Sequence, residues 1–291
     1  MKKNAKKWIA AALATVATVS LTACGGSTDT QEKTADSGET TVVKVGVVGE
    51  YNAQWDTINE LLADDGIQVE LVKFTDYAAP NRALNDGEID LNAFQHKAFL
   101  ANDIQQKGYD IVDIGDTIIA PLGIYNNKDK ISSIEDIKDG DVIAIPSDLT
   151  NGGRALKLLE AAGLIECDPA KGVVPTKADI TIYNKQIEIM EAESATLANL
   201  LPDCAAAVIN GGNAFTAGLN PVTDTIFMED VDPETNAAVP DLVNVIVART
   251  ADKDNEVYKK IVEAYHTPEV QKTIEDEYQG AFVCAWEGAA E

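Results

Sequence analysis

Short apolar runs that alternate with segments of helical periodicity organise most of this chain. Residues 41–48 (TVVKVGVV) are β-branched and apolar, which predicts a buried strand. Residues 55–63 place large apolar side chains at helical spacing, and Gly66 follows as a stop signal. Residues 67–71 alternate apolar and polar positions, so a second strand is expected there. This β-α-β order predicts a parallel sheet with a right-handed crossover.

The same two patterns recur further along the chain. They predict strands over residues 89–94, 142–145, 205–209 and 242–247, and helices from Pro80, over 154–162 and on both sides of Pro268. Strands and helices alternate in two successive stretches, and further strands follow near the C-terminus. This order indicates an α/β fold of two lobes with a ligand cleft between them. We assign residues 42–121 and 227–291 to one lobe and residues 122–226 to the other.

The N-terminal residues have the order of a secretory signal sequence. Four lysines and no acid precede an apolar run from Trp8 to Val19, which is too short for a bilayer span of about 20 residues. The sequence LTAC then ends at Cys24. This order resembles a bacterial lipobox, whose cysteine is lipidated and becomes the first mature residue; an ordinary signal peptide with a chance cysteine is the alternative. We expect residues 1–23 to be a lipoprotein signal peptide and Cys24 to carry the palmitate-containing anchor.

A polar stretch over residues 24–41 lacks bulky apolar side chains, so it cannot offset its ordering entropy by burial. It predicts a flexible linker between the lipid anchor and a globular part on the extracytoplasmic side of the cell membrane. Removing residues 1–23 takes away four lysines and no acid, which lowers the formal net charge from −25 to −29. Such acidity repels phosphates, so we expect no nucleic-acid partner and a membrane contact through the lipid alone.

Metal and catalytic chemistry find little support in the residue types. Cys167, Cys204 and Cys284 remain after Cys24, an odd number without CxxC spacing, and the chain has two histidines, so no metal site is expected. One disulfide and buried free thiols both stay open. No G-x-S-x-G motif occurs, and His266 falls between the predicted C-terminal helices. We therefore expect neither an enzyme nor a cofactor.

The segment TNGGR, which ends at Arg154, follows an apolar strand and opens a predicted helix. Asn151 is a good cap residue there, and the two glycines allow a ligand to approach free backbone N–H groups. A helix N-terminus beside an arginine suits a carboxylate or a phosphate. The alternative is a structural helix start with a solvated arginine. The GxxxxGK[ST] spacing of a phosphate loop is absent.

Aromatic side chains gather near the ends of two predicted strands. Phe94, His96 and Phe99 follow the third strand, and Tyr77 follows the second. Because ligands bind at the carboxyl ends of parallel strands, these residues are expected to line a small apolar pocket with a polar edge. Taken alone, His96 is better explained as an ordinary core or surface histidine.

Four segments occur in order: FTDYAAPNRALNDGEIDLNAFQHKAFL, IPSDLTNGGRALKLLEAAGLI, AAAVING and LVNVIVAR. Together they resemble the methionine-binding lipoproteins of the NlpA family, the substrate-binding components of methionine uptake transporters. The resemblance runs from about Val42 to Trp286. It implies a monomeric protein with a two-lobed, type II-like periplasmic-binding-protein fold. It also implies a methionine-like amino acid as ligand and an ABC transporter permease as partner.

The resemblance also assigns ligand-binding roles. It places Tyr77, Phe94, His96 and Phe99 around the thioether chain, Asn151 and Arg154 at the α-carboxylate, and Asn210 and Asn244 at the α-amino and carboxylate groups. Sulfur against aromatic edges is a favourable contact, and a guanidinium holds a carboxylate with two hydrogen bonds.

Two departures from the family pattern bear on selectivity. The family usually has tyrosine where this chain has Phe99, and Thr or Asn followed by Tyr where it reads Gly211-Gly212-Asn213. We expect a wider cleft beside the two glycines. A binding protein for another amino acid or a short peptide therefore stays open as an alternative. An exported enzyme and a surface-interaction lipoprotein are the further classes.

Overall fold

The computed structural model describes residues 40–172 and 174–289. The predicted signal peptide, the lipidation site Cys24 and nearly all of the 24–41 linker lie outside these residues. Among the described helices, none combines the length and the apolar character needed to cross a membrane.

Lobe 1 is built on a five-stranded sheet with the order β2-β1-β3-β13-β4. Its strands are β1 (Thr41–Val48), β2 (Ile67–Phe74), β3 (Leu91–His96), β4 (Ile111–Asp116) and β13 (Asn244–Arg249). β1 is parallel to both β2 and β3, with Thr41 opposite Ile67, whereas β13 is antiparallel to its neighbours. The predicted β-α-β opening is therefore confirmed.

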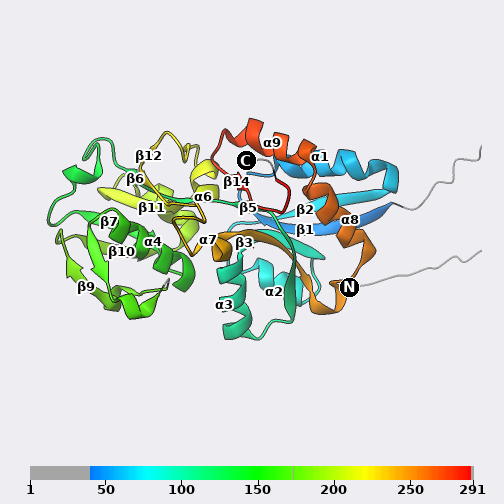
Figure 1. The fold of residues 1–291 in the computed structure, drawn as a ribbon, viewed down its shortest axis with the longest axis horizontal. Helices are drawn as coiled ribbons and strands as arrows, with labels where there is room; N and C mark the ends of the chain where they lie inside the picture. The colour runs from blue at the N-terminus through cyan, green and yellow to red at the C-terminus, as the bar shows by residue number, and fades with distance from the viewer. Residues whose placement is uncertain (1–39, 173, 290–291) are drawn as a thin grey trace, which may run out of the picture. The chain divides into compact units, whose positions relative to one another are not determined.

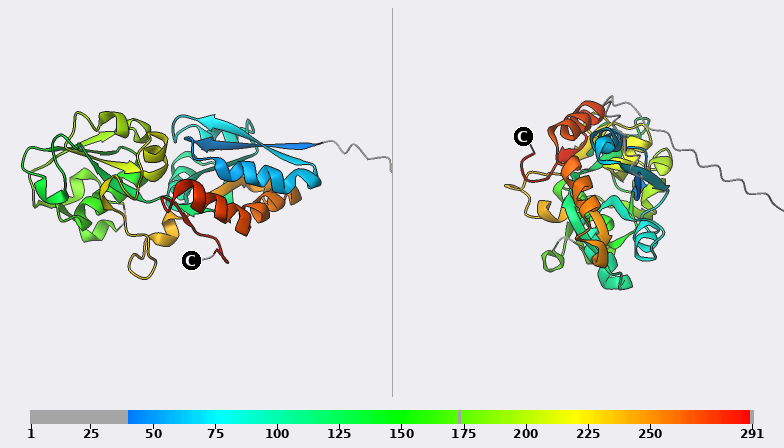
Figure 2. Two further views of the ribbon diagram at one scale, coloured as in Figure 1. Left: turned by 90° about the horizontal axis from the view of Figure 1, so that it is seen from above. Right: turned by 90° about the vertical axis from the view of Figure 1, so that its right-hand side faces the viewer.

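Helices cover both faces of this sheet (Figure 1). One face carries α1 (Ala53–Leu62), α8 (Glu256–Tyr265) and α9 (Pro268–Tyr278), and the other carries α2 (Pro80–Asn85) and α3 (Lys97–Lys107). Figure 2 shows α8 and α9 beside α1. Successive side chains of β13 point to opposite faces of the sheet. Ile246 packs in the apolar core on the α1 side, and Val247 packs in the core on the α2 side.

Lobe 2 is a second five-stranded sheet, with the order β10-β7-β11-β6-β12. Its strands are β6 (Leu122–Asn126), β7 (Val142–Pro146), β10 (Glu188–Ala192), β11 (Ala206–Asn210) and β12 (Thr225–Met228). α4 (Leu149–Ala161) packs on one face, and α5 (Leu197–Leu200) and α6 (Gly211–Thr216) pack on the other. Successive side chains of β11 point to opposite faces of the sheet, with Val208 packed on the α4 side and Ile209 on the α5 side.

Short elements complete the described chain. They are β5 (Ile118–Ile119) paired with β14 (Val283–Cys284), β8 (Ile165–Cys167) paired with β9 (Ile180–Tyr183), α7 (Val239–Leu242), and the 3-10 turns Ala63–Asp65, Ile134–Asp136, Pro169–Lys171, Lys177–Asp179, Ser194–Thr196 and Thr250–Asp252. The chain passes from lobe 1 to lobe 2 just after β5 and returns after β12 (Figure 1). The predicted α/β fold of two lobes is confirmed.

Three element boundaries differ from the sequence prediction. The third strand covers Leu91–His96, because its buried polar end continues the pairing beyond the apolar run. The run at 242–247 is divided, since Leu242 closes α7 and β13 begins at Asn244. The helix expected from Arg154 begins at Leu149.

The earlier start of α4 changes the role of its first turn. Asp148 is the N-cap, and its Oδ1 accepts the backbone N–H of Asn151 at 2.9 Å. Asn151 is thus a helical residue, and its prediction as the cap was wrong. Gly152 is helical as well, and an added Cβ there would lie only 2.9 Å from the carbonyl oxygen of Pro146. The glycine allows α4 to begin directly against β7.

Candidate ligand-binding site

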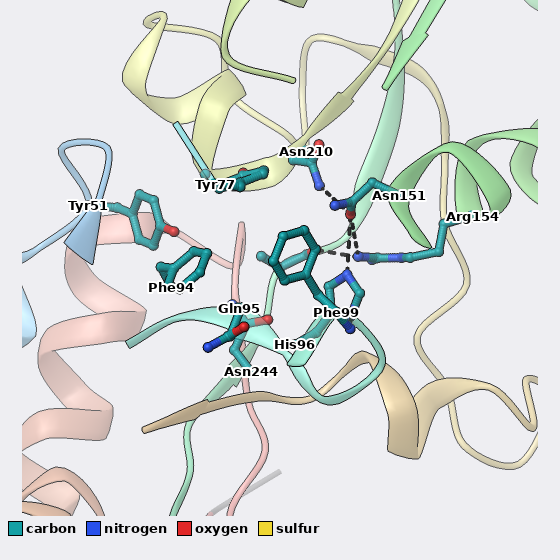
Figure 3. Close-up of a pocket in the computed structure, with 12 residues that line it drawn as sticks. Tyr51, Tyr77, Phe94, Gln95, His96, Phe99, Asn151, Arg154, Asn210 and Asn244 are labelled. Atoms are coloured by element: carbon teal, nitrogen blue, oxygen red, sulfur yellow. Dashed lines mark hydrogen bonds between the residues drawn. The ribbon is translucent and has the colours of Figure 1, made fainter. Parts of the chain in front are cut away.

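A pocket lies where the two lobes meet, at the ends of β3 and β11 and the beginning of α4 (Figure 3). The lining residues are Tyr51, Tyr77, Phe94, Gln95, His96, Phe99, Ala120, Asn151, Arg154, Asn210, Gly212 and Asn244. They enclose a narrow space that is partly open to solvent. All eight residues that the sequence assigns to the ligand are therefore brought together. Of the remaining four, Gly212 was expected beside the cleft, whereas Tyr51, Gln95 and Ala120 were not predicted.

Lobe 1 supplies an aromatic wall. The ring centroid of Tyr77 lies 5.9 Å from that of Phe94 and 6.1 Å from that of Phe99, and Phe94 and Phe99 are 5.9 Å apart. These rings pack with Val48 at the end of β1 in one apolar cluster. The predicted convergence of aromatic residues from two strand ends is confirmed. The wall offers ring edges and faces to an apolar ligand chain.

His96 joins this wall to the polar side of the pocket. It is the N-cap of α3, and its Nδ1 accepts the backbone N–H of Phe99 at 3.2 Å. Burial, reinforced by the positive charge of Arg154, lowers the pKa of His96 to about 3. The ring is therefore neutral at physiological pH. With Nδ1 accepting, Nε2 carries the proton and donates it to Asn151 Oδ1 at 3.2 Å.

Asn151 connects the polar groups of the pocket. Its Oδ1 accepts from His96 Nε2, from Asn210 Nδ2 at 2.8 Å and from Arg154 Nη1 at 3.4 Å. Its Nδ2 donates to both carboxylate oxygens of Asp148, each at 3.1 Å. The amide orientation is fixed from both ends, and the NH₂ group faces Asp148. In this structure Asn151 orients its neighbours and has no free donor for a ligand carboxylate.

Arg154 makes a buried ion pair that the sequence does not reveal. Its Nε and Nη2 donate to the two oxygens of Glu229 at 3.1 and 2.6 Å, and the side chains are only 8% and 10% exposed. Glu229 Oε2 also accepts the backbone N–H of Leu122 at 3.0 Å, so the pair is tied to the connection between the lobes. No local motif marks Glu229, which comes from a segment that follows β12. The solvated arginine of the alternative interpretation is not found.

Two amide side chains keep free hydrogen-bonding capacity at the pocket. Asn210 Oδ1 is buried and has no hydrogen-bond partner in the described part of the chain. The side chain of Asn244, across the pocket on β13, also makes no hydrogen bond to residues 40–172 or 174–289. A buried, unsatisfied polar atom is costly unless a ligand completes it. An amide oxygen is an acceptor, which suits an ammonium group.

The wider cleft expected beside Gly211 and Gly212 is not found. A Cβ on Gly212 would lie 2.7 Å from Cζ and 3.0 Å from the hydroxyl oxygen of Tyr51, and one on Gly211 would lie 2.9 Å from the carbonyl oxygen of Pro121. Tyr51 belongs to the loop between β1 and α1 and is 8% exposed. The ring of Tyr51, from lobe 1, therefore fills the space that Gly212 leaves. Sequence reasoning missed it because the two residues are far apart in the chain.

A cluster of buried amides holds β3 in place behind the pocket. Asn81 Nδ2 donates to Gln95 Oε1 at 2.7 Å and to Asp103 Oδ2 at 3.0 Å, and Asn92 Nδ2 donates to Asn81 Oδ1 at 3.0 Å. These bonds tie α2 and α3 to the strand that carries Phe94 and His96. A satisfied polar network of this kind fixes one arrangement of its elements.

Other chemistry has few groups to use. Over residues 40–172 and 174–289 no cluster of His, Cys, Asp or Glu side chains is arranged to hold a metal ion. Cys167, Cys204 and Cys284 are free thiols, and Cys167 and Cys204 are buried. His96 pairs with an amide and not with a nucleophile. The arrangement suits the binding of a small molecule with a charged end and an apolar chain.

Two α/β lobes that enclose such a pocket define the fold of a two-lobed substrate-binding protein. The family comparison agrees: the NlpA lipoprotein family model matches residues 43–286, and this chain belongs to that family. "Outer membrane lipoprotein 3" of Mannheimia haemolytica is 44% identical over 218 residues, which are 75% of this chain and 80% of that protein. "D-methionine-binding lipoprotein MetQ" of Salmonella typhimurium is 38% identical over 284 residues, 96% of this chain and 98% of that protein.

Solved structures carry the same fold. A nutrient binding protein from Burkholderia cenocepacia, described as bound to methionine, superposes with a TM-score of 0.78 at 36% identity. The match covers 84% of this chain and all of that one. The two-lobed architecture is thus shared with a protein that holds a small ligand.

Proposed function

We propose that this chain is the substrate-binding component of an ABC transporter and that it captures methionine or a close relative. The observation that carries the proposal is the division of the pocket. One side holds an arginine and neutral amides, and the other holds the aromatic wall. Full-length similarity to a D-methionine-binding lipoprotein and to a methionine-bound binding protein supports the same ligand.

The polar side fits a free amino acid headgroup. Glu229 occupies Nε and Nη2 of Arg154, and one N–H of Nη1 donates to Asn151 Oδ1 at 3.4 Å. The second N–H of Nη1 is therefore the donor left to receive an α-carboxylate. The unsatisfied Asn210 Oδ1 suits the α-ammonium group, and Asn244 offers a further amide from the opposite lobe. Neutral His96 adds no charge that would repel the ammonium.

The apolar side fits a thioether chain. Tyr77, Phe94 and Phe99 pack against one another, with ring centroids about 6 Å apart, and together present one continuous apolar wall to the pocket. Contacts between sulfur and aromatic rings contribute roughly 0.3–1.5 kcal/mol each and tolerate a flexible chain. Unbranched methionine therefore suits the space better than a branched or charged side chain does.

The proposal includes a location and a partner. We place the mature chain on the extracytoplasmic side of the cell membrane, anchored through Cys24, as a monomer that passes its ligand to the permease of the transporter. The sequence pattern at residues 1–24 and the lipoprotein relatives support the anchor. The chain acts by binding and release, with no chemical change to the ligand.

The ligand can be identified directly. The unlipidated protein is purified, its bound small molecule is read by mass spectrometry, and calorimetric titrations compare L-methionine, D-methionine, other apolar amino acids and glycyl-methionine. We expect tight binding of at least one methionine compound. Tight binding of an unrelated amino acid alone would refute the methionine assignment and leave the transport role standing. Conversion of the ligand to a new product would refute the binding role itself.

A further inference from the structure

We propose that Tyr51 is a specificity-determining residue that closes the far end of the pocket and so limits the length of the ligand side chain. The inference rests on the proposed function and deepens it. Tyr51 and Arg154 lie on opposite sides of the pocket in Figure 3, with the aromatic wall between them. A ligand whose carboxylate is at Arg154 therefore extends its side chain toward Tyr51.

The loop that carries Tyr51 is firmly braced. Asn52 Nδ2 donates to the carbonyl of Gly49 at 2.9 Å, and Gln54 Nε2 donates to the carbonyl of Tyr51 at 3.2 Å. Gln54 Oε1 in turn accepts the hydroxyl of Tyr278 at 2.8 Å, which ties the loop to α9. Gly49 has a φ of 85°, a conformation that favours glycine. The position of the Tyr51 ring is thus set by the fold of lobe 1.

The ring is confined on two sides. Its Cζ lies 2.7 Å from the point that a Cβ on Gly212 would occupy, and its centroid is 5.2 Å from that of Phe282. Phe282 belongs to the C-terminal segment that packs in the lobe 1 core. The ring has no room to move away from the pocket toward either neighbour, so the ligand cannot displace it easily.

Hydrogen bonds hold this contact in register across the lobes. The backbone N–H of Glu50, next to Tyr51, donates to Thr216 Oγ1 at 3.1 Å, and Thr216 Oγ1 donates to the carbonyl of Gly212 at 2.8 Å. One threonine of α6 therefore contacts both the loop of Tyr51 and the residue on which the ring packs. The pocket end is complete only when the two lobes are together.

The hydroxyl of Tyr51 is free to face the ligand. Within residues 40–172 and 174–289 it makes no hydrogen bond, and Figure 3 shows it directed into the pocket. Burial raises the pKa of Tyr51 to about 12, so the group stays protonated and able to donate. The bulk of the ring, and not the hydroxyl, is expected to set the length limit.

A homologous ligand series tests the inference. Calorimetry measures wild-type protein and Tyr51→Ala with L-methionine and with analogues whose S-methyl is replaced by S-ethyl or S-propyl. In the wild type each added methylene should weaken binding. In Tyr51→Ala the ratio of S-propyl to methionine affinity should rise by about 10-fold or more, because two methylenes gain a place to be buried. Tyr51→Phe is the matched control and should keep the wild-type ratio within about 3-fold.

Gly212→Ala provides the reciprocal test. The new methyl group should push the ring into the pocket and weaken methionine binding, and Tyr51→Ala in the same chain should relieve that loss. Thermal unfolding checks that each variant folds. An unchanged ratio in Tyr51→Ala, in a wild type that binds methionine, would overturn the inference alone. A wild type that binds none of the series would overturn the proposed function as well.

Discussion

The guanidinium of Arg154 and the carboxylate of Glu229 meet side by side, with Nε to Oε1 at 3.1 Å and Nη2 to Oε2 at 2.6 Å. Both groups are largely withdrawn from water. The glutamate therefore does two things: it neutralises the arginine, and it fixes the plane in which the remaining Nη1 edge points. Glu229, which does not need to touch the ligand, thus positions Arg154, the residue expected to bind the carboxylate.

Replacing Arg154 should lower both affinity and stability. Arg154→Met removes the carboxylate contact and should weaken ligand binding by about 30-fold or more. It also leaves Glu229 buried and unpaired, which costs roughly 3–5 kcal/mol of unfolding free energy. The double variant Arg154→Met with Glu229→Gln should recover most of the stability and none of the affinity. Calorimetry and urea unfolding measure the two effects. Recovery of affinity in the double variant would contradict the assigned role.

The two amides Asn244 and Asn151 should respond differently to substitution. Asn244→Ala removes a side chain that makes no hydrogen bond within the described part of the chain, so binding should weaken by about 10-fold while the unfolding free energy changes by less than about 0.5 kcal/mol. Asn151→Ala breaks bonds to His96, Asn210 and Asp148 and should cost roughly 1–3 kcal/mol of stability. Equal stability losses in the two variants would show that Asn244 is structural.

Acid should destabilise the protein partly through His96. The unfolded ring titrates near 6.5 and the folded ring near 3, so the unfolded state binds the extra proton between these values. The contribution of His96 is complete above pH 6.5 and is lost as the pH falls toward 3. In His96→Gln this part of the pH dependence of unfolding free energy should disappear. His266→Gln, which removes the other histidine, should retain it; the same slope in wild type and His96→Gln would refute the assignment.

The sequence predicts the fold well because its signals are local. The buried strands of both lobes and the glycine after α1 are read directly from apolar runs and turn residues. Errors arise where a tertiary contact decides the outcome. The sequence predicts a helix from Arg154, yet the helix begins at Leu149, because Gly152 has no Cβ and its turn can therefore pack against the carbonyl of Pro146.

The site is only partly predictable for the same reason. Phe94, His96 and Phe99 lie within one short segment, so their proximity follows from local structure. The Arg154–Glu229 pair and the Tyr51–Gly212 contact each join residues from distant parts of the chain. Nothing in the local pattern around any of these four marks its partner, and only the packed lobes bring them together.

The lipid anchor should be separable from the fold. Cys24 lies outside the described residues, and the first strand begins at Thr41. Cys24→Ala should therefore release a soluble protein whose thermal unfolding matches that of the anchored chain after detergent extraction. The acidic surface offers no electrostatic attraction to anionic lipid. Retention of this variant on membranes at high salt would mean that another contact holds it there.

The pocket is divided between lobes as well as between chemistries. Asn151, Arg154 and Asn210 stand on lobe 2, whereas the aromatic wall stands on lobe 1. A ligand with one end on each lobe is in effect a bivalent tether, and its covalent skeleton raises the effective concentration of the second contact once the first has formed. A fragment that keeps only the headgroup or only the side chain forfeits this advantage, so it should bind far more weakly than its missing contacts alone would suggest.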